Sequence, residues 1–185
     1  MDKKFIRTIL EKIKGRNIFL VGMMGCGKST IGPKLAQFLD YKFIDLDSLI
    51  EKVSDKAIDE IFMSDGEEAF RKIESQCLKE TVLLPSLIVS TGGGIVMKSE
   101  NWGILRQGIV VWIDLDKDIA LKRLGSDIQN RPLLKGKDFK RQYNQIFESR
   151  KNLYAQADLK VEISNHKIEE VIENILSAIS QEIFD

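Results

Sequence analysis

The 185-residue sequence predicts an α/β protein in which helices cover both faces of a parallel sheet. Short apolar runs alternate with longer segments of helical period, which is the pattern of parallel strands joined by crossover helices. The chain is 43% hydrophobic and 30% charged, a balance that suits one compact domain with a sizeable core. We therefore expect residues 1–185 to form a single three-layer α/β/α domain.

The predicted strands are five short apolar runs, at 17–21, 42–45, 87–90, 109–113 and 160–163. Segments whose apolar residues recur every three to four positions lie between them, and this period indicates helices. These helices are expected near 28–39, 47–53, 57–63, 66–83, 99–106, 116–124, 138–154 and 167–183.

The first 15 residues predict a further short helix. Its apolar residues fall on one helical face, which suits docking against the rest of the chain, and the stretch lacks the apolar core and cleavage site of a signal peptide. The face is formed by Phe5, Ile6, Ile9, Leu10 and Ile13. No apolar run approaches the roughly 20 residues needed to span a bilayer.

Composition narrows the choice of partners. Lys plus Arg and Asp plus Glu each number 28, so the formal net charge is zero and any affinity for phosphate must be local. The two cysteines, Cys26 and Cys77, stand in dissimilar settings and indicate neither a disulfide framework nor a zinc site. We expect a cytoplasmic monomer with no nucleic-acid or membrane partner.

A glycine-rich segment, GMMGCGKST, follows the first strand and opens the first long helix. Gly22-x-x-x-x-Gly27-Lys28-Ser29 in this context is the pattern of a phosphate-binding loop. Glycines let backbone N–H groups point at phosphate oxygens, and the helix adds the positive end of its dipole. Lys28 supplies charge to the outer phosphates, and the Ser29 hydroxyl is a ligand for Mg²⁺. The residues expected to contact the nucleotide are Gly25, Cys26, Gly27, Lys28, Ser29 and Thr30.

Two residues at this loop raise questions of their own. Pro33 lies inside the following helix, where proline forfeits a backbone hydrogen bond, so we expect a kink or a locally loosened turn. Cys26 lies near Lys28 and the helix N-terminus, surroundings that can activate a thiol. We interpret it first as a small loop residue without chemistry, with oxidation-sensitive nucleotide binding as the alternative.

Asp45 and Asp47 stand just past the second predicted strand, where ligands of an open parallel sheet collect. Asp45 could hold Mg²⁺ through water, and Asp47 could accept a proton or a hydrogen bond from a substrate hydroxyl. The alternative is a helix N-cap, with Asp47 or Ser48 as the capping residue.

Two later segments add candidate ligand contacts. Arg71 and Glu74 share one helix face, and as a surface ion pair they would contribute under about 1 kcal/mol. Three consecutive glycines, Gly92 to Gly94, follow the third predicted strand. Because each glycine costs ordering entropy, this run suggests backbone that lies directly against a ligand.

Taken together, six segments stand in the order and approximate spacing of the shikimate kinase family, and the chain resembles that family from residue 16 to about 163. They are GMMGCGKSTIG, the Asp-x-Asp of FIDLDSLIE, GEEAFRKIE, STGGG, NRPLL and SRKNLY. The resemblance implies a five-stranded sheet of order 2-3-1-4-5, as in nucleoside monophosphate kinases, with a mobile lid at about 125–138. It also implies Mg²⁺-dependent transfer of the γ-phosphate of ATP to the 3-hydroxyl of shikimate, in aromatic amino-acid biosynthesis.

The same resemblance implies roles for individual residues. For the acceptor, Asp47 would bind the shikimate hydroxyls and aid deprotonation. Arg71 and Arg150 would pair with the carboxylate, and Gly92, Gly93 and Gly94 would add backbone contacts. For the nucleotide, Arg131 in the lid would reach the phosphates, Arg123 would lie against adenine, and Ser29 and Asp45 would serve magnesium. Lys28, Asp47 and Arg131 would then form the catalytic set.

Several features are better explained without chemistry. The strand that ends at Asp114 resembles a Walker B strand, but we interpret it as a buried strand closed by a turn residue. His166 is expected in a solvated turn, and Trp102 and Phe147 in the core. Two rival functions stay open: a related small-molecule or nucleoside monophosphate kinase, and a catalytically silent relative.

Overall fold

The structure is a computed structural model that describes residues 2–125, 138–164 and 167–182. Within these residues the strands form one sheet in the order β2-β3-β1-β4-β5, which confirms the predicted order. Every neighbouring pair is parallel, so all the carboxyl ends lie at one edge of the sheet. The strands are β1 (Ile18–Val21), β2 (Lys42–Asp45), β3 (Leu87–Ser90), β4 (Ile109–Leu115) and β5 (Leu159–Ile163).

Burial explains the composition of the strands. All residues of the inner strands β1 and β3 are buried, which accounts for their continuous apolar runs. The edge strand β5 alternates buried and exposed residues. β4 extends two residues beyond the predicted end, so Asp114 lies inside the strand rather than in a turn, and its carboxylate pairs with Lys160 on β5 at 3.1 Å.

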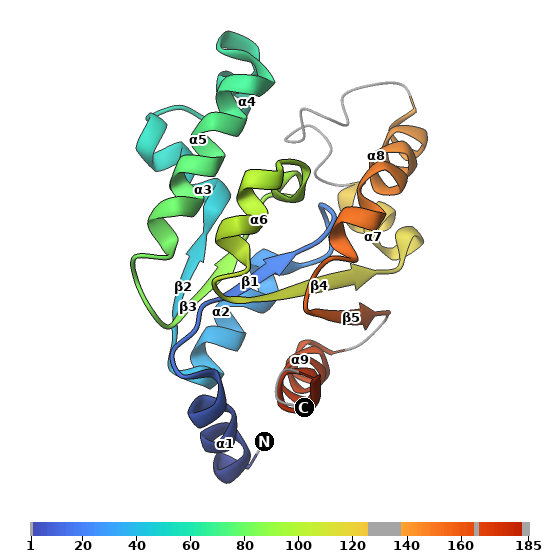
Figure 1. Ribbon diagram of the computed structural model, residues 1–185. Coiled ribbons are helices and arrows are strands. Elements are labelled where there is room, and N and C mark those ends of the chain that lie inside the picture. The colour runs from blue at the N-terminus through green and yellow to red at the C-terminus, as the bar shows by residue number, and fades with distance from the viewer. Residues whose placement is uncertain (1, 126–137, 165–166, 183–185) are drawn as a thin grey trace.

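Helices lie on both faces of this sheet (Figure 1). α2 contacts β2 and β3, α9 contacts β5, and Figure 1 shows α6 and α8 on the opposite side of the sheet. The helices are α1 (Lys3–Ile13), α2 (Lys28–Leu39), α3 (Leu46–Ser54), α4 (Ile58–Ser64), α5 (Gly66–Thr81), α6 (Ser99–Leu105), α7 (Lys117–Leu124), α8 (Phe139–Tyr154) and α9 (Ile168–Glu182). A 3₁₀ turn, η1 (Ile95–Met97), was not predicted.

The N-terminal helix α1 packs against α2 and α9. Ile9 and Ile13 on its apolar face are fully buried, and the side chain of Asp2 caps the helix by accepting from the backbone N–H of Lys4 at 3.1 Å. The helix ends at Ile13, and the next residue, Lys14, adopts a left-handed φ of 49°. α1 thus extends the layer formed by α2 and α9.

Pro33 does not interrupt α2, which runs as one helix from Lys28 to Leu39. The ring of Pro33 is exposed, whereas Ile31, Leu35 and Leu39 are buried on the face toward the sheet. Burial of that face stabilises the helix, so the hydrogen bond lost at Pro33 is tolerated on the solvent side.

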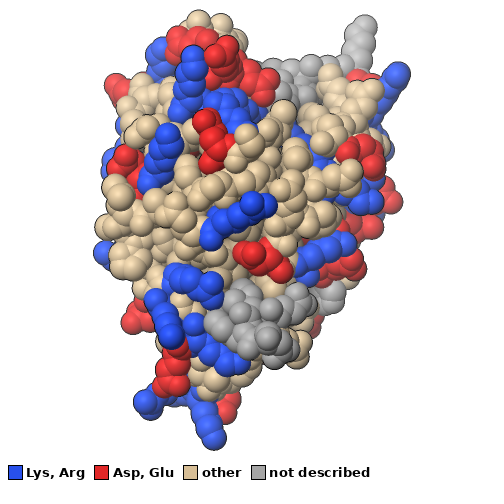
Figure 2. Space-filling model, in the orientation of Figure 1, with Lys and Arg blue, Asp and Glu red and all other residues tan. Residues whose placement is uncertain are grey.

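Charged side chains of both signs intermingle over the face shown in Figure 2, in keeping with a formal net charge of zero. Across the described ranges, none of the helices combines the length and the apolar character needed to cross a membrane.

Candidate active site

The glycine-rich loop turns from β1 into α2 at the carboxyl edge of the sheet. Gly22, Gly25 and Gly27 adopt positive φ angles of 142°, 79° and 96°. A Cβ atom on Gly22 would lie 2.5 Å from the carbonyl oxygen of Ile113, so this position requires glycine for space as well as for backbone angle.

Lys28 lies against this loop and is 8% exposed. Its Nζ donates to the carbonyl oxygens of Gly22 at 2.9 Å and Met23 at 3.1 Å, and lies 3.4 Å from Sγ of Cys26. Loop and lysine border a cavity of about 430 Å³. Its walls are formed by residues 24–31, Asp47, Ser90, Thr91, Gly93, Arg123, Ile163, Ile168 and Val171.

A second cavity of about 530 Å³ lies beside the first. Side chains of both charges line it, together with the three consecutive glycines. Its polar walls are Ser29, Asp45, Asp47, Ser48, Glu51, Asp59, Arg71, Glu74 and Arg150, and its apolar walls include Ile58, Phe62 and Phe70.

The two cavities meet, because Met24, Ser29, Asp47 and Gly93 line both of them. A molecule in the second cavity would therefore face whatever occupies the phosphate loop. This arrangement suits transfer of a group between two bound molecules, since such a reaction requires both partners to be held in line.

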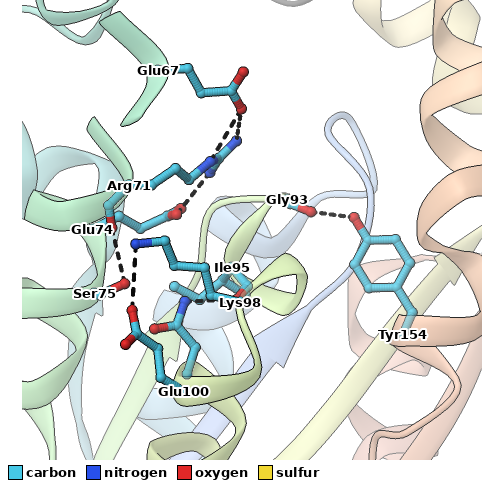
Figure 3. A network of polar contacts seen from close by, with 10 residues as sticks. Glu67, Arg71, Glu74, Ser75, Gly93, Ile95, Lys98, Glu100 and Tyr154 are labelled. Atoms are coloured by element: carbon cyan, nitrogen blue, oxygen red, sulfur yellow. Dashed lines mark hydrogen bonds and ion pairs between the residues drawn. The ribbon is translucent and has the colours of Figure 1, made fainter. Parts of the chain in front are cut away.

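Arg71 joins two carboxylates on α5 (Figure 3). Its Nη1 donates to Oε2 of the fully buried Glu74 at 2.7 Å, and its Nη2 donates to Glu67 at 3.0 Å. Burial opposes the charge on Arg71, but the two carboxylates outweigh it and hold the pKa of Arg71 above its usual value. Arg71 therefore stays a cation at the wall of the second cavity.

The Glu74 carboxylate uses only one of its two oxygens to bind Arg71. Burial raises the pKa of Glu74 and the charge of Arg71 opposes that rise. Its Oε1 accepts no hydrogen bond from the described residues, and an ideal Cβ placed on Gly92 would lie 2.6 Å from it and 3.1 Å from Oδ1 of Asp47. Two carboxylates therefore converge on the backbone of Gly92, which lacks a side chain that would obstruct them.

Arg150 projects from α8 and is 4% exposed. It lines the second cavity, and its Nε is buried without a hydrogen-bond partner in the part of the chain that the structure describes. A buried guanidinium N–H beside a cavity calls for an acceptor, because an unsatisfied buried donor is costly. A carboxylate is the ligand whose geometry matches that donor.

Asp45 and Ser29 stand where the two cavities adjoin. The Ser29 hydroxyl donates to Oδ2 of Asp45 at 2.6 Å, and Oγ of Ser90 lies 3.5 Å from that hydroxyl. Oδ1 of Asp45 accepts from the backbone N–H groups of Asp47 and Ser48 at 3.1 and 3.3 Å. The N-cap of α3 is therefore Asp45, not Asp47 or Ser48 as the capping alternative supposed, and Asp47 lines both cavities.

Comparison with known proteins agrees with this geometry. A family model described as shikimate kinase matches residues 24–180. The chain belongs to the shikimate kinase family.

Individual members of the family are similar over most of their length. A shikimate kinase of Prochlorococcus marinus (strain NATL2A) is 50% identical over 165 residues, which are 89% of this chain and 83% of that protein. A shikimate kinase of Nostoc punctiforme is 42% identical over 172 residues, covering 89% of this chain and 94% of that protein. The solved structure of shikimate kinase from Acinetobacter baumannii in complex with shikimate superposes with a TM-score of 0.89 at 31% identity, covering 96% and 99% of the two chains.

The structure brings most of the predicted site residues of this family member to the two adjoining cavities. Residues 25–30 line the first cavity, Asp45, Arg71, Gly92, Gly94 and Arg150 line the second, and Ser29, Asp47 and Gly93 line both. Arg123 reaches the first cavity beside the phosphate loop, with Nη1 3.5 Å from an ideal Cβ on Gly27. Arg131 and the expected lid at about 125–138 fall largely outside the described residues, as does His166.

Sequence reasoning missed several cavity residues. Glu74 was seen as a surface partner of Arg71, because spacing along a helix does not reveal burial. Ile163, Ile168 and Val171 line the nucleotide-side cavity, and nothing separates them in sequence from ordinary core residues. Ser90 also lines the first cavity, but no motif in the sequence marked it as a site residue.

Trp102, Phe147 and Asp114, which were interpreted as having no chemistry, do not line the two adjoining cavities. Trp102 and Phe147 are each 5% exposed and belong to the core, as predicted. Asp114 does not line the two adjoining cavities and pairs with Lys160, which agrees with the preference for a buried strand over a magnesium ligand.

Proposed function

We propose that this chain transfers the γ-phosphate of ATP to the 3-hydroxyl of shikimate, giving shikimate 3-phosphate and ADP in aromatic amino-acid biosynthesis. Membership of the shikimate kinase family supports this proposal. The observation that carries it is the junction of the two cavities, where a phosphate loop meets a pocket with two buried arginines.

The second cavity suits shikimate, which has one carboxylate and several hydroxyls. Arg71 and Arg150 offer forked cationic donors for the carboxylate, and both are more than nine-tenths buried, where charge-assisted hydrogen bonds are strong. Asp47 offers an acceptor for a hydroxyl at the boundary with the phosphate loop. We assign Asp47 to the reacting 3-hydroxyl, whose proton it is placed to accept or orient.

The first cavity suits ATP. Gly25 to Thr30 would surround the phosphates with backbone N–H groups, and Lys28 would exchange its contacts with Gly22 and Met23 for phosphate oxygens. The apolar side chains of Ile163, Ile168 and Val171 would support the base, with Arg123 nearer the loop. A role for Arg131 on the phosphates rests on the NRPLL segment alone.

The residues present also fit magnesium. Ser29 Oγ and Asp45 Oδ2 lie 2.6 Å apart beside the phosphate loop, and both are the oxygen ligands that Mg²⁺ prefers. Bound Mg²⁺ would neutralise charge on the transferring phosphate. Ser29 would hold it directly and Asp45 through water, while the second oxygen of Asp45 stays engaged in capping α3.

Phosphoryl transfer asks the protein chiefly for alignment and charge. Lys28, Mg²⁺ and Arg131 would supply positive charge around the transferring phosphate, and the shared wall of Met24, Asp47 and Gly93 would set the distance between donor and acceptor. We further propose a cytoplasmic monomer without nucleic-acid or membrane partners. The formal net charge of zero supports the last point, because it gives no general attraction to nucleic acid or anionic membranes.

Release of ADP by the purified protein with Mg-ATP tests the function, with shikimate, gluconate, AMP or no acceptor. We expect turnover with shikimate alone, and loss of that turnover in Arg71→Ala with ATP binding retained. Turnover with another acceptor would keep the kinase and discard the acceptor assignment. ATP binding without transfer to any acceptor would favour a silent relative.

A further inference from the structure

Tyr154, the last residue of α8, reaches the active site without lining it. The side chain is fully buried, and its hydroxyl donates to the carbonyl oxygen of Gly93 at 2.5 Å and lies 3.7 Å from Sδ of Met23 (Figure 3 shows the bond to Gly93). Tyr154 is not among the described residues that line the two adjoining cavities, whereas Gly93 lines both. Tyr154 would therefore act on the reaction through its neighbours, of which Gly93 accepts the hydrogen bond of its hydroxyl.

Gly93 lies between this hydroxyl and the phosphate loop. An ideal Cβ on Gly93 would lie 3.4 Å from the carbonyl oxygen of Gly22, 3.5 Å from the backbone nitrogen of Met24 and 3.5 Å from the Tyr154 hydroxyl. The glycine segment is thus packed against the phosphate loop on one side and tied to α8 on the other. Its position sets how closely the two cavities approach.

The start of the segment is anchored to β1, and its end is anchored to α6 by Asn101 and Trp102, which donate to the carbonyl oxygens of Ile95 and Val96 at 2.8 and 3.1 Å. Thr91 donates to the carbonyl oxygen of Leu20 through its backbone N–H at 3.2 Å and its hydroxyl at 2.9 Å. Those bonds fix the start of the segment to β1, the strand that leads into the phosphate loop. The carbonyls of Gly92 and Gly94 accept from the backbone N–H groups of Ile95 and Met97 within the segment itself, whereas the carbonyl of Gly93 is held from outside it, by Tyr154 of α8.

The tyrosine is itself held by rigid elements. Its ring stacks on Trp112 of β4 with centroids 5.9 Å apart, and Nζ of Lys160 lies 4.9 Å from the centre of the Trp112 ring. Burial raises the pKa of Tyr154, and the neighbouring Arg150 only partly offsets this rise, so the hydroxyl keeps its proton and remains a donor. Side chains locked in this way can set a distance, because their own rotamers are fixed by packing.

We propose that Tyr154 is a positioning residue that sets the separation of the glycine segment and the phosphate loop, and hence the alignment of acceptor and phosphate. The expected effect on kcat depends on the proposed function, whereas the expected effect on the position of the glycine segment does not. Small displacements at such a junction are costly, since a misplacement of about 1 Å can lower a rate by about a hundredfold.

Tyr154→Phe tests the proposal, because it removes the hydroxyl and keeps the ring that stacks on Trp112. The control is Tyr41→Phe, at a half-buried tyrosine before β2 that lines neither cavity. For each variant we would measure kcat with shikimate, the affinity for Mg-ADP by calorimetry, and amide hydrogen exchange in residues 91–97. Assays well below the thermal midpoint of each variant keep both proteins folded.

We expect Tyr154→Phe to lower kcat by about tenfold or more with unchanged affinity for Mg-ADP, and to speed exchange in residues 91–97. Tyr41→Phe should do neither. A lower thermal midpoint with wild-type kcat and exchange would overturn the proposal and leave a purely structural tyrosine. If the wild-type protein does not phosphorylate shikimate, the proposed function fails, and exchange alone decides: faster exchange supports the positioning role and unchanged exchange overturns it.

Discussion

Removal of Arg71 should expose the electrostatic cost of the carboxylate beneath it. Glu74 is fully buried, its Oε2 accepts from Arg71 at 2.7 Å, and its Oε1 accepts nothing from the described residues. Arg71→Ala therefore leaves a buried charge without its cation, which costs about 3–5 kcal/mol of folding free energy at neutral pH. Adding Glu74→Gln removes that charge and leaves only an unpaired amide, so the double variant should recover about 2 kcal/mol.

The pH dependence gives the sign of this effect. The pKa of Glu74 is raised above its ordinary 4.5 in the folded protein, so the associated stability is full below 4.5 and is lost as pH rises through the folded pKa. The charge of Arg71 lowers that pKa, so its removal moves the folded pKa further up and deepens the loss at neutral pH. The single and double variants should therefore converge as pH falls toward 4.5.

Urea unfolding of the wild type and both variants, followed from neutral pH downward, measures these differences. Arg7→Ala is the control, because Arg7 pairs with Glu11 at 3.0 Å with both side chains largely exposed, and such pairs contribute under about 1 kcal/mol. Equal destabilisation of the single and double variants at neutral pH would refute the reasoning, since Glu74 would then carry no uncompensated charge.

Three further substitutions test other parts of the site and fold. Gly92→Ala should lower kcat/KM for shikimate and leave the affinity for Mg-ADP intact, because the new Cβ would lie 2.6 Å from Oε1 of Glu74. Gly103→Ala is the control, since nothing lies within 4 Å of a Cβ at that position. Steady-state kinetics and calorimetry measure the two quantities. Lys28→Ala should abolish measurable Mg-ADP binding by calorimetry in protein that still unfolds cooperatively, and retained binding would contradict the loop assignment. Asn17→Ala should cost about 2–4 kcal/mol in urea unfolding with kcat preserved. The side chain of Asn17 makes three hydrogen bonds of 2.9–3.0 Å, to the backbone of Thr81, Leu84 and Leu87, and a loss below about 1 kcal/mol would contradict this expectation.

Much of the fold and the nucleotide side of the site could be predicted from sequence, because the physics there is local. The periods of strands and helices are read from neighbouring residues, and they predicted all five strands. The observed bounds lie within one residue of the predicted bounds, except at the end of β4, which is two residues later than predicted. The spacing of Gly22, Gly27 and Lys28 carries its own mechanism, since positive φ and a helix N-terminus are properties of the segment itself.

The acceptor side depended on tertiary structure, because burial and proximity are set by packing between distant segments. Spacing placed Arg71 and Glu74 on one helix face, but only packing of α5 against α3, α4 and the glycine segment makes them a buried pair, and they line the same cavity as Arg150. Tyr154 and Gly93 are 61 residues apart, and their hydrogen bond exists only because α8 ends over the carboxyl edge of the sheet. The sequence by itself determined what the phosphate loop is, whereas the assembled fold decided which side chains surround the space in front of it.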